Sequence, residues 1–337
     1  MSLTRFVVRR LLLIIPVLIG VTLLTFSLSH IVPGDPARLA AGPQGTQAMY
    51  EQLRDEFGLD DPLPVQYWNY ATGLLEGDWG QSILSRRPVL SDLQTYWPAT
   101  FELVLVAMTI ATLIGVPLGV LAAVKADRFA DHFSLILSLL FLSVPAFWLA
   151  ILMQLVLGLR LDWFPISGRL PALVKPPPDV TGMYTVDALL AGNFDLFLTC
   201  LRHVILPATT LCVGALATIS RFTRASLLEV LNNDYVRTAR AKGLSERRVI
   251  TRHALRNAFI PTITMIGLSF GWAMGGAVLV ETVFDWPGIG LYATKSALTL
   301  DFMPIIGIAL LYGIVFSLIN IAIDIAYGFL DPRVSHS

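Results

Sequence analysis

Charged residues are scarce in this chain, at 14% of 337 residues, whereas an ordinary globular domain has about a quarter. Hydrophobic residues reach 55% and are gathered in long runs, which favours a polytopic membrane protein. The 24 basic and 24 acidic residues cancel, so nothing in the charge indicates a nucleic-acid partner. The two cysteines, Cys200 and Cys212, lie in or beside one apolar run, so we expect buried, inert thiols and no disulfide framework.

Motifs that carry chemistry are also missing. The sequence has no GxxxxGK[ST] loop, so we expect no ATP binding of the P-loop kind. It has no GxSxG nucleophile elbow, and its five histidines are scattered, without metal-ligand spacing. We therefore expect no catalytic, cofactor or metal site in this chain. A membrane-embedded enzyme is the weakest hypothesis for its function.

The apolar runs predict an all-α membrane protein with six transmembrane helices. The expected spans are residues 11–32, 99–124, 132–159, 200–220, 259–280 and 304–327. With both termini cytoplasmic, the inner segments hold 15 basic residues and the outer ones 8, as the positive-inside rule requires. We divide the chain into a tail with the first span (1–31), an external subdomain (32–97) and a core of five spans (98–337).

Several single residues refine this prediction. Pro145 falls within the third run, where we expect a kink. Glu102 falls near the outer end of the second run, where its carboxylate can reach water. Trp97, Trp163 and Trp286 fall at expected outer boundaries, which is typical of an interfacial aromatic belt.

Two further patterns lie in the last two runs. Gly267 and Gly271 have GxxxG spacing, which permits close helix packing; we favour packing within this chain over a pore-lining role. Asn320 and Asp324 are four residues apart and share a helix face. They form a possible intramembrane polar site, although capping or pairing near the inner end is the favoured interpretation.

The stretch 221–257 is a polar island between two apolar runs, with nine basic and three acidic residues and a net charge of +6. Asp234 can cap a short helix over Tyr235–Lys242, and Gly243 suits a left-handed stop. Ser245 can cap a second helix that begins at Glu246. This loop either only sets topology or receives another protein, because its small residues would permit close contact.

The run from Asp234 to Gly243, followed by RHALRNAFIP at 252–261, resembles the cytoplasmic signature loop of ABC importer permeases, especially the dipeptide/oligopeptide subfamily. That family's loop reads Glu-Ala-Ala, three residues, then glycine. Here the first three positions are Arg237, Thr238 and Ala239, and the glycine is Gly243. Strings at 31–37, 57–70, 161–169 and 281–290 are similar to the same family.

The resemblance implies a coupling helix that seats in a groove of a separate ATPase subunit. The residues implied in ATPase coupling are Asp234, Tyr235, Arg237, Thr238, Ala239, Arg240, Ala241, Lys242 and Gly243. It further implies a second homologous permease, two ATPase subunits that bind ATP and Mg²⁺, and a periplasmic or extracellular substrate-binding protein. The location would be the bacterial inner membrane, with residues 32–97 in the periplasm.

The implied function is import of dipeptides or short oligopeptides by alternating access. Glutathione, nickel complexes and haem are alternative cargoes of related permeases, and the sequence does not identify the substrate path. A stand-alone secondary transporter is the rival of a different class. Such a transporter usually needs ionisable groups at depth, whereas Glu102 and Asp324 both fall near the ends of runs.

Overall fold

The computed structural model describes residues 3–31, 36–41, 45–56 and 58–330. Across these ranges the chain is helical and forms no strand, apart from an isolated bridge between Gln81 and Pro88, in agreement with the predicted all-α class. It divides into two compact units. The larger comprises Met1–Arg10, Pro98–Leu291 and Leu318–Ser337, and the smaller comprises Leu11–Trp97 and Tyr292–Ser317.

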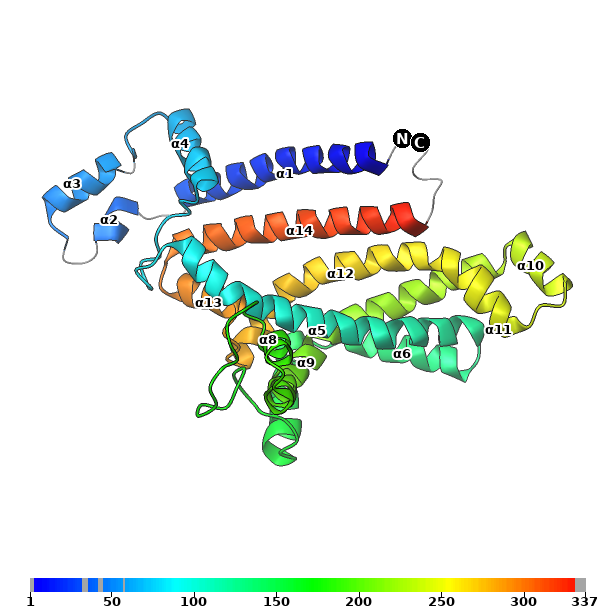
Figure 1. Cartoon of the computed structure of the whole chain (residues 1–337). Coiled ribbons are helices and arrows are strands. Elements are labelled where there is room, and N and C mark those ends of the chain that lie inside the picture. The colour runs from blue at the N-terminus through cyan, green and yellow to red at the C-terminus, as the bar shows by residue number, and fades with distance from the viewer. Residues whose placement is uncertain (1–2, 32–35, 42–44, 57, 331–337) are drawn as a thin grey trace. The chain divides into compact units, whose positions relative to one another are not determined.

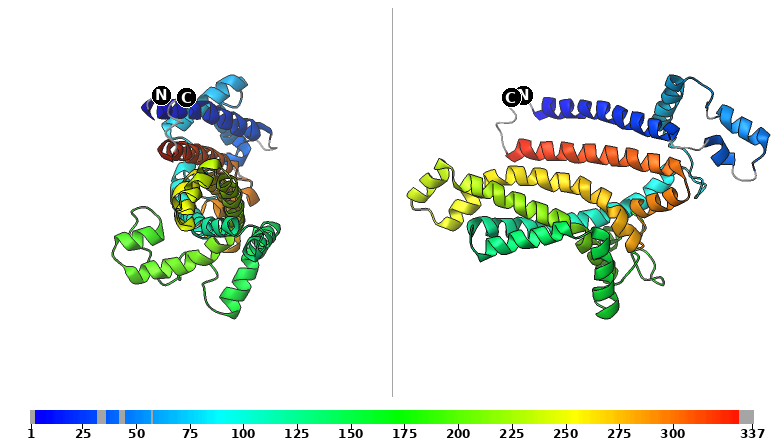
Figure 2. Two further views of the ribbon diagram at one scale, coloured as in Figure 1. Left: turned by 90° about the vertical axis from the view of Figure 1, so that its right-hand side faces the viewer. Right: turned by 180° about the vertical axis from the view of Figure 1, so that it is seen from behind.

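The larger unit is built around two long helices, α9 and α12, which lie side by side (Figure 1). Helix α6 runs along α9, and α10 lies at the end of the unit where α9 and α12 are joined (Figure 2). In chain order the elements are α5 (Val89–Val124), α6 (Phe129–Ser143), α7 (Ala146–Met153), a π-helical segment (Gln154–Arg160), α8 (Tyr184–Leu190), α9 (Phe194–Leu231), α10 (Asp234–Ala241), α11 (Glu246–Arg248), a π-helical turn (Val249–Ala254) and α12 (Leu255–Val283).

The smaller unit holds most of α1 (Leu3–Ile31), then α2 (Pro36–Ala41), α3 (Gln47–Glu56) and α4 (Leu63–Glu76). It also holds the start of α5, most of α13 (Ile289–Leu298) and the first half of α14 (Phe302–Leu330). Two tyrosines connect α4 to α1 by hydrogen bonds between hydroxyl groups: Tyr67 with Thr22 at 2.9 Å, and Tyr70 with Thr25 at 3.1 Å.

Among the described residues, four helical segments are long and apolar enough to cross a membrane: 89–124, 194–231, 246–283 and 302–323. A fifth arises if α6 and the helix from Ala146 to Arg160 count as one span, although they meet at 98°. The apolar stretch Leu12–Ser27 of α1 is shorter. The count of six spans therefore remains a prediction.

The kink expected at Pro145 is present and is more complete than expected, because the helices on its two sides are separate and meet at 98°. Helix α6 ends at Ser143, and α7 begins at Ala146 in a new direction. Pro145 has φ −62° and ψ 133°, an extended conformation, and it has no amide hydrogen with which to continue the ladder of α6. The residue before a proline is also biased away from the helical region, and Val144 is extended too.

The helix boundaries predicted from the apolar runs are also wrong in two places. Helix α5 begins at Val89 and not at 99, and α9 runs to Leu231, so residues 221–231 of the polar island continue the long helix. A run of apolar residues locates what is buried in lipid or protein, whereas backbone hydrogen bonding continues through any good helix formers.

Small residues let the helices of the larger unit approach closely, as the favoured interpretation of the Gly267 stripe predicted. A Cβ at Gly267 would lie 2.0 Å from Cδ1 of Ile323 on α14. A Cβ at Gly119 on α5 would lie 2.4 Å from the carbonyl oxygen of Ser220 on α9. Both cysteines of α9 are buried and unbridged, also as predicted.

Candidate functional site: the α10 loop

Helix α10 begins differently from the prediction. Asn233, not Asp234, is the N-cap residue, and its carbonyl accepts from the amides of Val236 (3.0 Å) and Arg237 (3.2 Å). No side chain caps the helix. The Asp234 side chain is 97% exposed and lies 3.7 Å from Arg237 Nη1, so it faces solvent and not the free amides. The predicted two-turn helix itself is confirmed, displaced by one residue.

The end of α10 is a left-handed stop at Gly243, as predicted. Gly243 has φ +76°, its amide bonds the carbonyl of Arg240 at 2.9 Å, and the Leu244 amide reaches that of Ala239 at 3.4 Å. These two bonds form a Schellman motif, and the contact of Leu244 with Ala239 is the hydrophobic pairing that accompanies it. The stop turns the chain back toward α12.

The inner face of α10 closes a small apolar core. Val236 and Ala239 are buried together with Val249 of the π-helical turn, and Val230, Leu231 and Leu244 pack around them. The sequence predicted that Ala239 lies on an outward contact surface, and this is wrong because its side chain is buried. Its small side chain is needed for the approach of α10 to its own loop.

The outer face of α10 is polar and basic. Its exposed residues are Asp234, Tyr235, Arg237, Thr238, Arg240, Ala241, Lys242 and Gly243. Two of them are held by the loop itself: Tyr235 accepts from Asn257 Nδ2 at 2.8 Å, and Arg240 pairs with Glu246 at 2.7 Å. The hydrogen bonds that Arg240 donates to Glu246 raise the pKa of Arg240 above its ordinary value.

The segment after Gly243 is one helical rod in three stretches. Ser245 is the N-cap residue of α11, as predicted, but its side chain makes no cap bond; its carbonyl accepts from the amides of Arg248 and Val249. Helix α11 continues through the π-helical turn into α12. The core under α10 therefore joins the end of α9 to the start of this rod.

The predicted pair Asn320 and Asp324 lies on α14, one turn apart. The Asp324 side chain falls outside the described residues, so an intramembrane polar site at this pair remains a prediction.

At the opposite end of α9, the structure shows an ionic cluster that the sequence analysis missed. Glu102 of α5 is buried and does not reach water, contrary to expectation. Its Oε2 lies 2.6 Å from Arg169 Nη2, and its Oε1 accepts from the amide (2.7 Å) and hydroxyl (2.6 Å) of Thr185. Arg169 also donates to the carbonyl of Gly182 at 2.8 Å and stacks 3.5 Å over the ring of Tyr184.

A second buried carboxylate, Glu281, organises the turn between α12 and α13. It accepts from the Thr100 hydroxyl (2.6 Å) and from the amides of Gly290 (2.7 Å) and Leu291 (3.0 Å). Trp286 in this turn is buried, with its indole N–H on the Ala99 carbonyl at 2.9 Å. Its expected place in an exposed aromatic belt is therefore wrong. Glycines in the string DWPGIG were the available signal, because only a bare backbone fits around this carboxylate.

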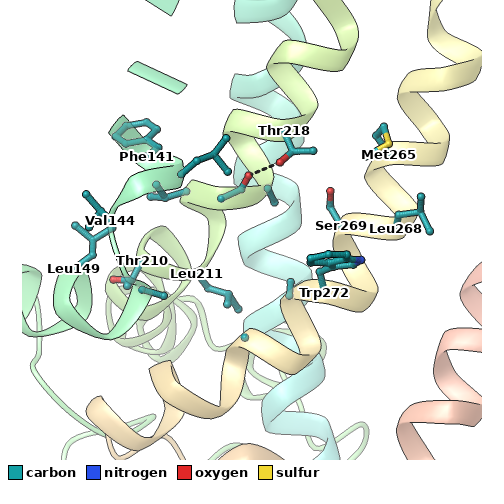
Figure 3. Close-up of a pocket in the computed structure, with 17 residues that line it drawn as sticks. Phe141, Val144, Leu149, Thr210, Leu211, Thr218, Met265, Leu268, Ser269 and Trp272 are labelled. Atoms are coloured by element: carbon teal, nitrogen blue, oxygen red, sulfur yellow. Dashed lines mark hydrogen bonds between the residues drawn. The ribbon is translucent and has the colours of Figure 1, made fainter. Parts of the chain in front are cut away.

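Between these two ends lies a cavity of about 470 Å³ (Figure 3). Its walls come from the break between α6 and α7, from α9 and from α12. Most lining residues are apolar, such as Phe141, Leu211 and Trp272, and the polar exceptions are the hydroxyl residues Thr210, Thr218 and Ser269. The Thr218 hydroxyl donates to the Gly214 carbonyl at 2.9 Å.

Comparisons with known proteins match nearly the whole chain. Residues 115–336 match the family described as binding-protein-dependent transport system inner membrane component, and residues 3–104 match the N-terminal family of the same system. The probable D,D-dipeptide transport system permease protein DdpB of Escherichia coli K12 is 44% identical over 94% of each chain. The dipeptide transport system permease protein DppB of the same strain is 42% identical over 98% of this chain and 99% of that protein.

Two further similarities are more distant. The glutathione transport system permease protein GsiC of Salmonella typhimurium LT2 is 38% identical over 98% of this chain and 99% of that protein. A chain of the MetNI methionine ABC transporter, solved in inward-facing conformations, has the same fold at a TM-score of 0.50 and 17% identity, covering 69% of this chain and 93% of that one. The chain thus belongs to the family of binding-protein-dependent transport system inner membrane components, the permeases of ABC importers.

Proposed function

We propose that this chain is one of two transmembrane subunits of an ATP-driven importer of dipeptides or short oligopeptides. The names of its relatives DdpB and DppB support a peptide cargo. A periplasmic binding protein would deliver the cargo, and two separate ATPase subunits would bind ATP and Mg²⁺. The observation that carries the proposal is helix α10, a short basic helix with a polar outer face and an inner face sealed on its own core.

This construction suits a mechanical link. Val236 and Ala239 are packed against both the end of α9 and the turn that begins the α12 rod. A displacement of α10 by a bound ATPase subunit would therefore move both helices together. In the proposed cycle, closure of the ATPase dimer tilts these helices and opens the path to the external face, and hydrolysis resets them.

The membrane arrangement completes the proposal. Six spans, with α1 as the first and the bent α6–α7 pair as the third, place α10 and both termini in the cytoplasm. Residues 32–97 then face the periplasm, where they would help to receive the binding protein. The excess of basic residues in the inner segments, 15 against 8, supports this orientation.

Glutathione is the alternative cargo with direct support, because GsiC covers the same length at 38% identity. Nickel complexes and haem remain cargo hypotheses from the resemblance alone. A stand-alone secondary transporter is the alternative of a different class. Purification separates the classes, since an ABC importer retains its ATPase subunits and takes up substrate only with ATP.

The exposed face of α10 provides the direct test. We expect Arg237→Glu combined with Ala241→Trp to abolish ATPase retention and peptide uptake in proteoliposomes, because both side chains point away from the core. The inward Ala239 is unsuitable, since a charge there would disrupt the loop itself. Lys175→Glu, at an exposed site on the external segment, is the control and should transport normally. Normal ATP-coupled uptake by the α10 variant would refute the proposal.

A further inference from the structure

An ion pair between a buried aspartate and a partly exposed arginine joins α6 to α9, away from the loop just described. Asp131, in the first turn of α6, is fully buried. Its carboxylate accepts from Nε and Nη2 of Arg224 on α9, with Nη2 at 2.6 Å. The Asp127 amide donates to the same carboxylate at 3.0 Å, so the turn before α6 is fixed as well. Bidentate arginine–carboxylate pairs are strong and geometrically specific.

The other polar contact near this place is much weaker. The hydroxyls of Ser134 and Ser220 lie 3.4 Å apart, at the limit of a hydrogen bond. Besides Asp131, the buried residues of α6 are the small Ser134 and Ser138. Small residues thus let the two helices approach, and the Asp131–Arg224 pair sets their position along one another. An ion pair with two parallel bonds resists sliding in a way that a surface of small side chains does not.

The position of the pair connects two parts of the larger unit. Arg224 lies about two helical turns before the end of α9, whose residues Val230 and Leu231 pack into the core under α10. At its far end α6 contributes Phe141 and Leu142 to the wall of the cavity, opposite residues of α9 and α12. A rigid connection therefore runs from α10 through α9 to α6 and so to the break before α7.

We infer that Asp131 and Arg224 form a positioning link that transmits the displacement of α10 from α9 into α6, and so into the cavity wall. The inference rests on the proposed coupling role of α10 and extends it to a third helix. Without the link, a displacement of α10 would still move α9 and α12, but α6 would no longer move together with α9. ATP would still be hydrolysed, but fewer substrate molecules would cross for each ATP.

The test uses the complete importer in proteoliposomes and measures ATP hydrolysis and peptide uptake together. Single variants Asp131→Asn and Arg224→Gln leave one buried polar partner unmatched and can reduce assembly on those grounds alone. The double variant Asp131→Asn/Arg224→Gln removes both charges, while an amide oxygen at 131 can still accept from Asp127. The matched control is Ser134→Ala/Ser220→Ala, which removes the weaker hydroxyl contact between the same two helices and leaves the ion pair in place.

We expect the double variant to assemble and to hydrolyse ATP, but to transport roughly fivefold or more fewer peptides per ATP, whereas the control keeps the wild-type ratio. Recovery of the wild-type ratio in the double variant would overturn the inference, because the pair would then serve stability alone. Loss of the ATPase subunits from the double variant would overturn it too, since the pair would then act in docking. A failure of the proposed function itself is recognisable separately, because the wild-type complex would show no ATP-dependent uptake.

Discussion

The buried pair of Glu102 and Arg169 allows a quantitative prediction about the segment that leads into α8. We consider Arg169→Met, which keeps the length and apolar stem of the side chain but removes the guanidinium. Glu102 would remain a buried carboxylate that accepts only from Thr185. Removing one partner of a buried ion pair costs about 3–5 kcal/mol, because the other charge is left uncompensated.

The lost stabilisation should affect mainly the local structure around α8. Arg169 also holds the Gly182 carbonyl at 2.8 Å and stacks on Tyr184, so its removal frees the chain that leads into this helix. A loss of about 3 kcal/mol in the free energy of local opening increases the open population by about two powers of ten. We expect amide hydrogen exchange over Tyr184–Leu190 to accelerate by about that factor, since exchange follows the open population.

The control is the same substitution at an exposed ion pair. The side chains of Arg54 and Asp60 are 39% and 64% exposed and lie 2.6 Å apart, and such pairs contribute less than about 1 kcal/mol. Arg54→Met should leave exchange over α8 unchanged. Unchanged exchange over α8 in Arg169→Met would refute the reasoning, because it would mean that the buried pair does not hold the segment.

Three further predictions concern single positions. Gly243→Ala should destabilise the end of α10 by about 1–2 kcal/mol, seen as faster exchange of the Leu244 amide, whereas Gly243→Asn should cost less because asparagine tolerates φ +76°. Gly290→Ala should prevent a stable turn between α12 and α13, since its Cβ would lie 2.5 Å from the Val278 backbone. Gly275→Ala on α12, with nothing within 4 Å, should be neutral or stabilising in thermal unfolding. Burial raises the pKa of Asp187, but hydrogen bonds donated by Thr181, Val180 and Gly182 together lower it by more, to below its usual 3.8. Protection of these three amides from hydrogen exchange should therefore persist above pH 3.8 and fall as the pH drops further. Asp187→Asn should abolish this pH dependence.

The sequence allowed the coupling loop to be predicted well because its signals are local. Helix α10 (Asp234–Ala241) is short and is stopped by Gly243, and each signal acts within a few residues. What failed there was the facing of α10: the sequence places Ala239 among small residues but does not show that Val249, beyond the turn, packs against it. A helix of two turns is too short for periodicity to separate its faces.

The ionic cluster at the other end could not be predicted because its parts are distant in sequence. Glu102, Arg169 and Thr185 come from three different elements, and hydropathy places the first merely near the end of an apolar run. Trp286 illustrates the same limit. A tryptophan at a span boundary is typical of an aromatic belt, and only tertiary packing shows that its indole is bound inside to Ala99.

The spacing of polar contacts along α9 relates these parts to the membrane. His203 Nδ1 meets the Gly168 carbonyl at 3.0 Å, and Arg224 holds Asp131; the helix between them is about 32 Å long, close to the ~30 Å of a hydrocarbon core. The cavity-lining stretch Thr210–Thr218 falls within this interval. Polar and charged groups are costly at such depth, so the polar contacts at the two ends and the apolar, hydroxyl-bearing middle follow from one constraint. A wall with so few polar groups offers a peptide little to distinguish it by, and we therefore expect cargo selectivity to depend on the binding protein and the second permease more than on this chain.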